Sequence, residues 1–485
     1  MGNLIKIVLF VFCSYSAIGQ IKFFKFYTNN GSDQGQGVVQ LEDSSYVITG
    51  ASSSFSGSSQ AFLLHVDSLG NYLWSNNYGG PESESGRRVL YKKNFGFFIC
   101  GFTNSIGSGG FDNYLAKVDE LGNLEWEKAY GGEGWEKVHD AALTKDTGVI
   151  MVGETSSNFS DNQDIYIVRT DILGDTLWTK TIGGIGDDFA TSISSFTDST
   201  FVITGQYYIE DSALVKMYVT YIKDDGTVIW SDFVGNDGNY WSNDFTFVGN
   251  QILGVGGCNS VITDEPDPVA YIYDISGFYG GETKSIGPGK QEFKNIASFG
   301  PLDAYYITNS SEDDFSYLNG PDLLVMKYST FPSFAFEGGI NIGFENPDVS
   351  GEVIRTNDGG AIVVGYSTGQ VSGGNEVFLV KIGPNDDYPN TILDVVIDNI
   401  VTIKESSIDK SLKIFPNPTN GILNISTENL NYNTIRIISS VGKEISTIDF
   451  QLSTKIDVSA FETGLYFIEI TGTNSSTIVK QITVK

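Results

Sequence analysis

The chain has 485 residues, with 59 acidic against 29 basic side chains and a formal net charge of −30 at pH 7. This charge argues against a nucleic-acid partner, because contacts to phosphates need a basic surface. The 56 glycines and 13% of aromatic residues, beside only 18% of charged ones, indicate many short strands joined by turns and argue against a coiled coil or a disordered chain.

The N-terminus has the pattern of a signal peptide. Lys6 lies within an apolar run over residues 4–12, and small residues follow up to Gly19. We therefore expect a leader over residues 1–19, with cleavage directly after Gly19. A membrane anchor is the less favoured alternative, because the run is shorter than the ~20 apolar residues that span a bilayer. No transmembrane span is expected elsewhere in the chain.

Four tryptophans recur at a constant interval of 52 residues: Trp74, Trp126, Trp178 and Trp230. Each period contains four strand-like runs, for example Asp140–Thr144, Val149–Thr155, Ile165–Thr170 and Leu177–Ile182. Four-stranded units at a period of about 50 residues are typical of β-propeller blades. We interpret the four tryptophans as packing residues between blades rather than as ligand platforms.

Residues 20–385 are predicted to form an all-β propeller of about seven blades, with six or eight as the alternatives. The seventh blade stops at its third strand near Gly383, so Lys22–Tyr27 is expected to add the fourth strand. Pairing the two ends in this way closes the ring and removes exposed sheet edges. Residues 386–410 are predicted to be a linker, in which the apolar run Ile392–Ile403 forms an extended strand on one of the domains.

Residues 411–485 alternate in the manner of seven short strands, which is typical of a small Ig-like β-sandwich. A more specific pattern is carried by Pro416, Asn417, Pro418, Gly421, Gly464, Tyr466, Lys480 and Lys485. In this order and at the C-terminus, these residues resemble the type A C-terminal sorting domain of the type IX secretion system. The resemblance implies a Gram-negative bacterium, the secretion machinery as a partner, and a place outside the cell or on its outer surface. An ordinary Ig-like accessory domain is the alternative.

The loops between blades, and those between second and third strands, are expected to emerge on one face, where loops on a rigid frame commonly carry function. The candidate ligand-binding residues there are Glu133, Trp135, Glu136, Asp187, Asp188, Tyr240 and Trp241. Trp135 and Trp241 lie outside the 52-residue register, which favours stacking platforms for a sugar ring or a protein ligand. The alternative is that each tryptophan covers the top of a blade.

No cofactor is expected, although one metal remains as an alternative. Asp112, Asp164, Asp322 and Glu376 recur just before the third strand, where they are either caps or oxygen ligands for Ca²⁺. No zinc pattern is present, and Cys100 and Cys258 lie in apolar runs typical of buried thiols.

The sequence contains no known catalytic motif, so no catalytic residue is predicted. We expect a secreted or cell-surface binding or adhesion protein, monomeric, with a glycan or protein ligand. One alternative is an extracellular polysaccharide-acting hydrolase or lyase that uses loop carboxylates. The other is a structural surface protein without a discrete ligand.

Overall fold

The computed structural model describes residues 21–28, 31–54, 58–157, 162–235, 238–259, 266–284, 291–298, 303–310, 323–329, 335–343, 347–368, 374–383, 392–396, 413–415, 419–427, 432–439, 444–461, 463–472 and 477–484. The predicted leader at 1–19 and most of the linker at 386–410 lie outside these residues, as do Pro416, Asn417, Pro418 and Lys485. The chain divides into two compact units, within residues 8–402 and 403–485.

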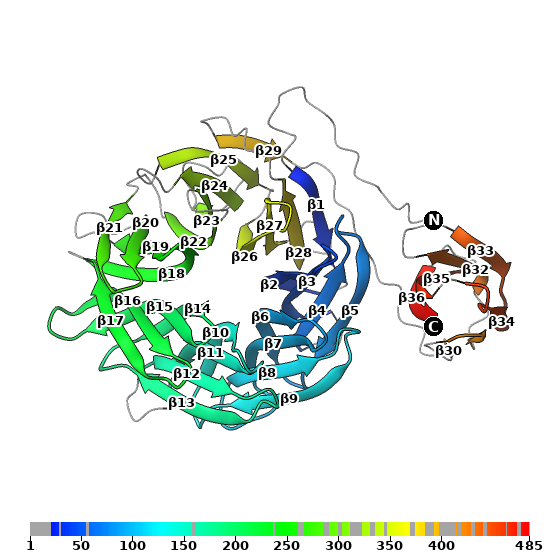
Figure 1. The fold of residues 1–485 in the computed structure, drawn as a ribbon, viewed down its shortest axis with the longest axis horizontal. Coiled ribbons are helices and arrows are strands. Elements are labelled where there is room, and N and C mark those ends of the chain that lie inside the picture. Colours follow the sequence, from blue (N-terminus) through cyan, green and yellow to red (C-terminus); the bar gives the residue numbers. More distant parts are fainter. Residues whose placement is uncertain are drawn as a thin grey trace. The chain divides into compact units, whose positions relative to one another are not determined.

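Antiparallel sheets build the first unit, and Figure 1 shows them following one another around a common centre, as propeller blades do. The prediction of an all-β propeller is confirmed. Five sheets hold four strands in chain order, with the first strand innermost. They are blade 1, β2 (Asp33–Gln40), β3 (Tyr46–Ser52), β4 (Gln60–Val66) and β5 (Tyr72–Tyr78); blade 2, β6 (Glu84–Lys92), β7 (Gly96–Thr103), β8 (Asp112–Val118) and β9 (Leu124–Tyr130); blade 3, β10 (Glu136–Leu143), β11 (Val149–Thr155), β12 (Asp164–Thr170) and β13 (Thr176–Ile182); blade 4, β14 (Phe189–Thr197), β15 (Thr200–Ile209), β16 (Leu214–Lys223) and β17 (Val228–Val234); and blade 5, β18 (Asn239–Val248), β19 (Gln251–Asn259), β20 (Pro266–Asp274) and β21 (Tyr279–Lys284).

Two further sheets take strands from distant parts of the chain. They are blade 6, β22 (Gln291–Ser298), β23 (Asp303–Ser310), β24 (Leu323–Ser329), β25 (Ala335–Gly343) and β29 (Ile392–Val396); and blade 7, β26 (Asp348–Arg355), β27 (Ala361–Thr368), β28 (Asn375–Ile382) and β1 (Ile21–Tyr27). Strand β29 pairs in parallel with β25. Strand β1 pairs antiparallel with β28, so the N-terminal segment adds the outer strand of blade 7, as predicted.

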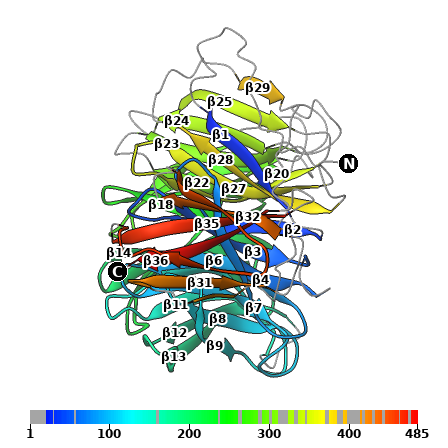
Figure 2. The same ribbon diagram turned by 90° about the vertical axis from the view of Figure 1, so that its right-hand side faces the viewer.

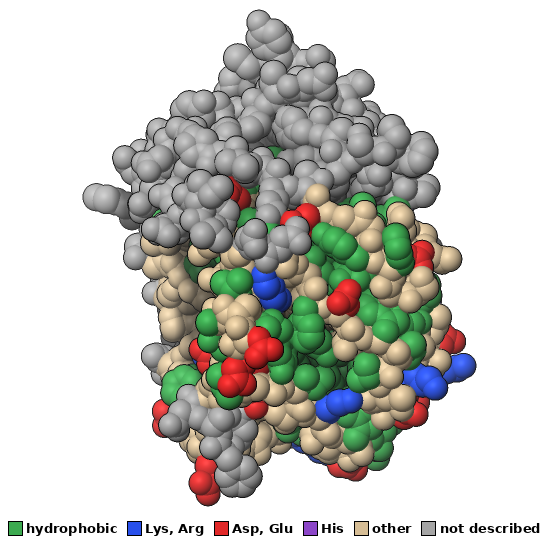
Figure 3. Space-filling model, turned by 90° about the vertical axis from the view of Figure 1, so that its left-hand side faces the viewer, with side chains coloured by type: hydrophobic (Ala, Val, Ile, Leu, Met, Phe, Trp, Pro, Cys, Tyr) green, Lys and Arg blue, Asp and Glu red, His purple; other side chains and the backbone are tan. Residues whose placement is uncertain are grey.

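The strands of a blade differ in burial according to their place in it. Second and third strands such as β11 are buried along their whole length, because neighbouring blades cover both faces of the sheet. Fourth strands such as β13 alternate between exposed and half-buried residues. Figure 3, seen from the side of β17 and β21, shows hydrophobic side chains dispersed among polar ones on this outer surface.

The recurring tryptophan contacts the turn glycine of the next blade. A Cβ placed on Gly174, whose φ is +76°, would lie 2.7 Å from the Trp126 ring. Four residues after the tryptophan, the Tyr130 hydroxyl donates a hydrogen bond to the Gly174 carbonyl oxygen over 2.6 Å. Each glycine turn is therefore covered by the ring of the preceding blade. The equivalent ring contacts are Trp74 to Gly122, Trp178 to Gly226 and Trp230 to Gly277.

A β-bulge recurs in the first strand of every blade. In blade 3 the register shifts between Val138 and Asp140, so that His139 forms the bulge. The second strand has Gly153 at this level, where a Cβ would lie 1.9 Å from the Lys137 carbonyl oxygen. Only glycine fits so close to the neighbouring backbone.

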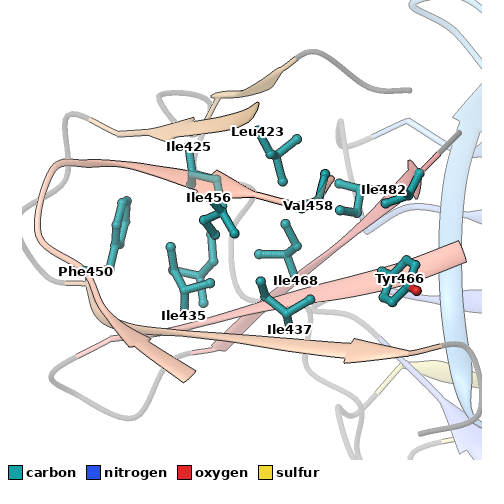
Figure 4. Close-up of a cluster of buried hydrophobic side chains, with 12 residues drawn as sticks. Leu423, Ile425, Ile435, Ile437, Phe450, Ile456, Val458, Tyr466, Ile468 and Ile482 are labelled. Atoms are coloured by element: carbon teal, nitrogen blue, oxygen red, sulfur yellow. The ribbon is translucent and has the colours of Figure 1, made fainter. Parts of the chain in front are cut away.

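The second unit contains two sheets, β30-β31-β34 and β33-β32-β35-β36. Their strands are β30 (Lys413–Phe415), β31 (Ile422–Ser426), β32 (Tyr432–Ser439), β33 (Glu444–Asp449), β34 (Ser453–Asp457), β35 (Gly464–Gly472) and β36 (Thr477–Val484). Figure 2 shows β35 and β36 side by side. Alternate residues such as Leu423, Ile437 and Ile468 from the two sheets meet in one apolar core (Figure 4).

Candidate functional site

Trp135 lies on the loop between blades 2 and 3, and its side chain is 50% exposed. Its backbone is held on both sides. The N–H of Trp135 donates to Ser156 Oγ, and its carbonyl oxygen accepts from the Ser156 N–H, both over 2.8 Å. On the other side, the Glu136 N–H donates to the Phe111 carbonyl oxygen over 2.6 Å. An exposed indole on a fixed backbone needs little ordering when it binds a ligand.

Three aromatic rings and two cations make a continuous series of contacts, which we call the Trp135 row. The Trp135 ring packs edge-on against Phe111 with centroids 5.2 Å apart, and Phe111 packs in the same way, at the same distance, against Phe102. Lys137 Nζ lies 5.2 Å from the Trp135 centroid, and Arg87 Cζ lies 5.5 Å from that of Phe102. Both are cation–π distances.

A buried carboxylate, that of Glu154, lies near both cations of this row. Glu154 is 8% exposed, and its Oε2 is 3.5 Å from His139 Nε2. Burial alone would raise the pKa of Glu154, but the hydrogen bond and charge of His139, with the charges of Lys137 and Arg87, hold it below its usual range. Glu154 therefore stays ionised, and its negative charge interacts with several basic side chains at once.

Trp241 differs from Trp135 although both lie outside the tryptophan register. Its side chain is half-buried, and a Cβ on Gly257 would lie 2.4 Å from its ring. Its indole N–H donates to Glu292 Oε2 of the next blade over 2.8 Å. These contacts match the alternative in which the tryptophan covers its own blade.

Three of the predicted ligand-binding residues are buried, so the prediction that they face a ligand is wrong. Glu136 is 1% exposed, and Asp188 and Tyr240 are 0% exposed. Glu136 accepts hydrogen bonds from the Gly132 N–H and the Thr155 hydroxyl, and so ties the blade-connecting loop to the second strand. The remaining two acids, Glu133 and Asp187, are exposed.

Asp188 and Tyr240 occupy the same place in blades 4 and 5. Asp188 accepts hydrogen bonds from the N–H groups of Gly184 and Tyr208. In blade 5 Tyr240 replaces the carboxylate, and Lys216 Nζ lies 5.5 Å from the centroid of its ring. The acids that recur at this position therefore hold the loops together. In the sequence these acids look like exposed loop residues, because a sequence alone does not show which side of a strand end is covered.

Asp112, one of the four candidate Ca²⁺ ligands, belongs to a buried carboxylate pair. Its side chain is 1% exposed, Oδ2 accepts from the Ser108 N–H over 2.7 Å, and buried Oδ1 has no hydrogen-bond partner among the described residues. A Cβ on Gly131 would lie 2.0 Å from both Asp112 Oδ1 and Glu136 Oε2, so the two oxygens lie together around this glycine. Burial and, less strongly, the charge of Glu136 raise the pKa of Asp112 to about 6, against the opposing effect of the Ser108 hydrogen bond.

Two of the other Ca²⁺ candidates lie in blades other than that of Asp112: Asp164 is on β12 of blade 3 and Glu376 is on β28 of blade 7. Asp164 is beside Asp188, where its charge helps to raise the pKa of Asp188, and Asp322 lies outside the described residues. In the described part of the chain, no group of three or more His, Cys, Asp or Glu side chains is arranged to hold a metal ion. Cys100 and Cys258 are both buried, and they lie in separate blades.

Replacing Asp112 with Asn is expected to change how stability depends on pH. The folded wild type holds a proton on Asp112 that the unfolded chain releases nearer pH 3.8, so raising the pH through this window to about 6 destabilises the fold. Above pH 6 Asp112→Asn should therefore be the more stable protein, by about 1 kcal/mol, since it removes a poorly satisfied buried charge. As the pH falls through this window the advantage should shrink, and below about pH 3.8 it should be gone.

Urea unfolding of Asp112→Asn and wild type at pH 4.5 and pH 8 checks this expectation, with exposed Asp198→Asn as the control. Equal stability differences at the two pH values would contradict the paired-carboxylate interpretation.

The second unit has a clear relative. Residues 413–485 match the family described as secretion system C-terminal sorting domain. The C-terminal unit is a sorting domain. The protein is therefore exported through the type IX secretion system, to the cell surface or the extracellular space. Among the residues predicted to carry the motif, Gly464 begins β35 and Tyr466 lies in the core of the sorting domain. The described residues contain no helix that could span a bilayer.

The chain also has more distant relatives. Over 281 residues the chain is 25% identical to a WD repeat-containing protein of Acanthamoeba polyphaga mimivirus, which covers 56% of this chain and 18% of that protein. The chain thus spans less than a fifth of that relative's length. Solved structures similar to the chain include the Pan2 WD40 domain of Neurospora crassa (11% identity, 61% and 88% of the two chains covered, TM-score 0.38). They also include Sqt1 from Chaetomium thermophilum (9%, 95% and 98%, 0.42) and the polysaccharide lyase Uly1 (9%, 72% and 90%, 0.43). These similarities concern the fold alone.

Sequence reasoning missed four members of the Trp135 row: Arg87, Phe102, Phe111 and Lys137. Comparison of the bulge position between blades offers a signal that could have found Arg87. The residues at the bulge in blades 1 to 5 are Gln36, Arg87, His139, Thr191 and Asn243. A permanent cation at this position in blade 2 is not required by the repeat, because other blades fold with neutral side chains there.

Proposed function

We propose that the protein is an exported binding or adhesion protein that holds a sugar ring against Trp135. The observation that carries this proposal is a half-exposed indole on a backbone fixed by three hydrogen bonds. The flat face of an indole stacks on the C–H face of a sugar, and its N–H donates to a hydroxyl. Trp135 Nε1 has no acceptor among the described residues, so this donor is available to a ligand.

The surroundings of Trp135 favour a sugar over a protein ligand. A protein interface needs a sizeable apolar centre around its anchors. Of the exposed large hydrophobic residues, only Trp135 and Ile185 lie on the described loops between blades; most of the others belong to strands or to the opposite turns. A small aromatic platform, in which Phe111 packs against the Trp135 ring, fits a narrow polar ligand better than a protein surface.

The structure lends less support to a hydrolase that uses loop carboxylates. Such an enzyme holds two acids about 5–10 Å apart around the scissile bond. Of the four acids predicted on the loops, Glu136 and Asp188 are buried and bonded to loop N–H groups. The other two, Glu133 and Asp187, lie on different blade-connecting loops. The binding proposal needs no such pair.

The test is glycan binding by the chain without its predicted leader. A panel of immobilised plant, algal and bacterial polysaccharides should retain the wild type, and Trp135→Ala should weaken binding about tenfold or more, since a central aromatic anchor contributes over 1 kcal/mol. Ile185→Ala, an exposed hydrophobic side chain on the next blade-connecting loop, is the matched control and should bind as wild type. Failure of every glycan to bind, or full binding by Trp135→Ala, would overturn the proposal. Release of soluble sugar would favour the enzyme instead.

A further inference from the structure

We infer that the ligand at Trp135 is an anionic polysaccharide, whose carboxylate or sulfate groups contact Lys137 and Arg87 while one sugar ring stacks on the indole. This inference rests on the proposed sugar-binding function and adds the chemical class of the sugar. It starts from the unusual placement of two cations in a chain with a net charge of −30.

Neither cation of the Trp135 row has a carboxylate within salt-bridge distance in the described part of the chain. Other basic side chains of the propeller commonly do: Lys128 pairs with Asp175 over 2.6 Å, and Arg169 pairs with Asp224 over 2.8 Å. Lys137 and Arg87 instead lie over aromatic rings. The charge of the buried Glu154 acts on both cations without a salt bridge to either. Because two cations share this one carboxylate, net positive charge remains for an anion from outside.

Arg87 also has an unused donor. Its Nη1 donates to Gln36 Oε1 over 3.1 Å, but its Nε is buried and has no acceptor among the described residues. A partly desolvated guanidinium without a paired anion is unfavourable. Because Nε is buried and the Arg87 side chain is half-buried as a whole, a carboxylate or sulfate group would pair with the exposed part of the guanidinium. The buried carboxylate of Glu154 acts on Arg87 through its charge, but among the described residues its ion pair is with His139, over 3.5 Å, and not with Arg87.

The order of groups along the row matches a charged sugar chain. The rings of Trp135, Phe111 and Phe102 lie between Lys137 and Arg87, so the cations mark its two ends. A polysaccharide that carries acid groups on either side of apolar ring faces presents the same order of charge, ring faces and charge. A neutral glycan would use the rings and leave both cations unpaired.

Long-range repulsion from the acidic chain does not prevent such binding. At physiological ionic strength, charges are screened beyond about 8 Å, so the groups in contact with the ligand dominate. Contacts between a polyanion and two cations should nevertheless weaken as salt rises. Salt dependence is therefore a property that distinguishes this inference from neutral sugar stacking.

The experiment measures binding of the leaderless chain to polygalacturonate, to a sulfated galactan and to neutral galactan. The wild type should bind one or both of the anionic polymers, which distinguishes carboxylate from sulfate, at least about tenfold more tightly than neutral galactan. Binding should weaken several-fold between about 50 and about 500 mM NaCl. Lys137→Gln and Arg87→Gln should each weaken binding to the anionic polymer, while Lys137→Arg should retain it.

Lys128→Gln is the matched control. Lys128 also lies over a tryptophan, 5.6 Å from the Trp126 centroid, but it is paired with Asp175, so this variant should bind as wild type. Binding to neutral galactan that requires Trp135 but is indifferent to salt and to Lys137→Gln would overturn the anionic ligand and leave the proposed function intact. No binding to any glycan by a folded wild type would overturn both.

Discussion

A chain that ends at residue 410 is expected to accumulate in the periplasm, and almost none of it should reach the outside of the cell. The sorting domain at residues 413–485 is the part that the secretion system recognises, and it forms a unit of its own. Its removal therefore leaves the propeller strands and their pairing unchanged. Immunoblots of periplasm, outer membrane and medium, from a host that carries a type IX secretion system, measure the distribution.

Substitutions at two neighbouring residues of β32 distinguish the effect of unfolding the sorting domain from the effect of a change on its surface. Ile437 is fully buried in the core of the sorting domain, so Ile437→Asp should unfold it and reproduce the deletion. Arg436, next to it, faces the other side and pairs with Glu469 over 2.8 Å. Arg436→Gln should be exported normally, because a surface ion pair contributes only about 0–1 kcal/mol. Full export of the truncated chain would contradict the role of the sorting domain.

Replacing Phe26 with Ala is expected to destabilise the propeller by about 3–5 kcal/mol, the usual effect of emptying a buried phenylalanine site. Phe26 lies on β1 and is 1% exposed, in a core shared with Phe378 of β28 and Val325 of β24. Because β1 joins the first part of the chain to the last blade, weakening it also weakens the closure of the ring. Urea unfolding followed by tryptophan fluorescence measures the loss.

The side chains of β1 contact different blades, and an exposed residue of the same strand provides the control. Phe24 and Phe26 enter the core shared by blades 6 and 7, whereas Tyr27 donates to the Gly70 carbonyl oxygen of blade 1 over 2.8 Å. Lys22 is on the same strand and exposed, so Lys22→Ala should change stability little. If Phe26→Ala unfolded at the urea concentration of the wild type, β1 would not be the strand that closes the ring.

The pairing of Phe23 in β1 shows that the repeat pattern also includes blade 7. Phe23 pairs with Lys381 in the register that Trp178 has with Arg169, and a Cβ on Gly70 would lie 2.8 Å from the Phe23 ring. Phe23 thus takes the place of the recurring tryptophan in blade 7. A search restricted to tryptophan does not find this equivalence, since a different aromatic side chain fills the same space.

The strands of the sorting domain were predictable from the sequence. Seven short strands are expected within residues 411–485, and the described part of this segment holds seven, β30 to β36. The local sequence pattern determines such strands, because alternate residues must face one core and turn residues must lie between the strands. The same holds for the propeller, where a constant period repeats the local pattern in every blade.

The candidate site was predictable only in part. Trp135 was singled out because it departs from the repeat, and it is exposed. Glu136 follows it directly in the chain but is buried, because its carboxylate bonds to Gly132 and Thr155 rather than to solvent. Two adjacent polar loop residues look alike in a sequence, and only their neighbours decide which is covered.

The sequence by itself determined the strand repeat, the pairing of its two ends and the sorting domain, because each depends on residues at fixed spacing along the chain. Tertiary structure alone decided which aromatic and charged side chains meet. Arg87, Phe102, Phe111 and Lys137 come from different strands and loops of two blades, and bulges and loop hydrogen bonds set their distances. Contacts between chain segments so far apart depend on how the blades pack, and no local pattern encodes that.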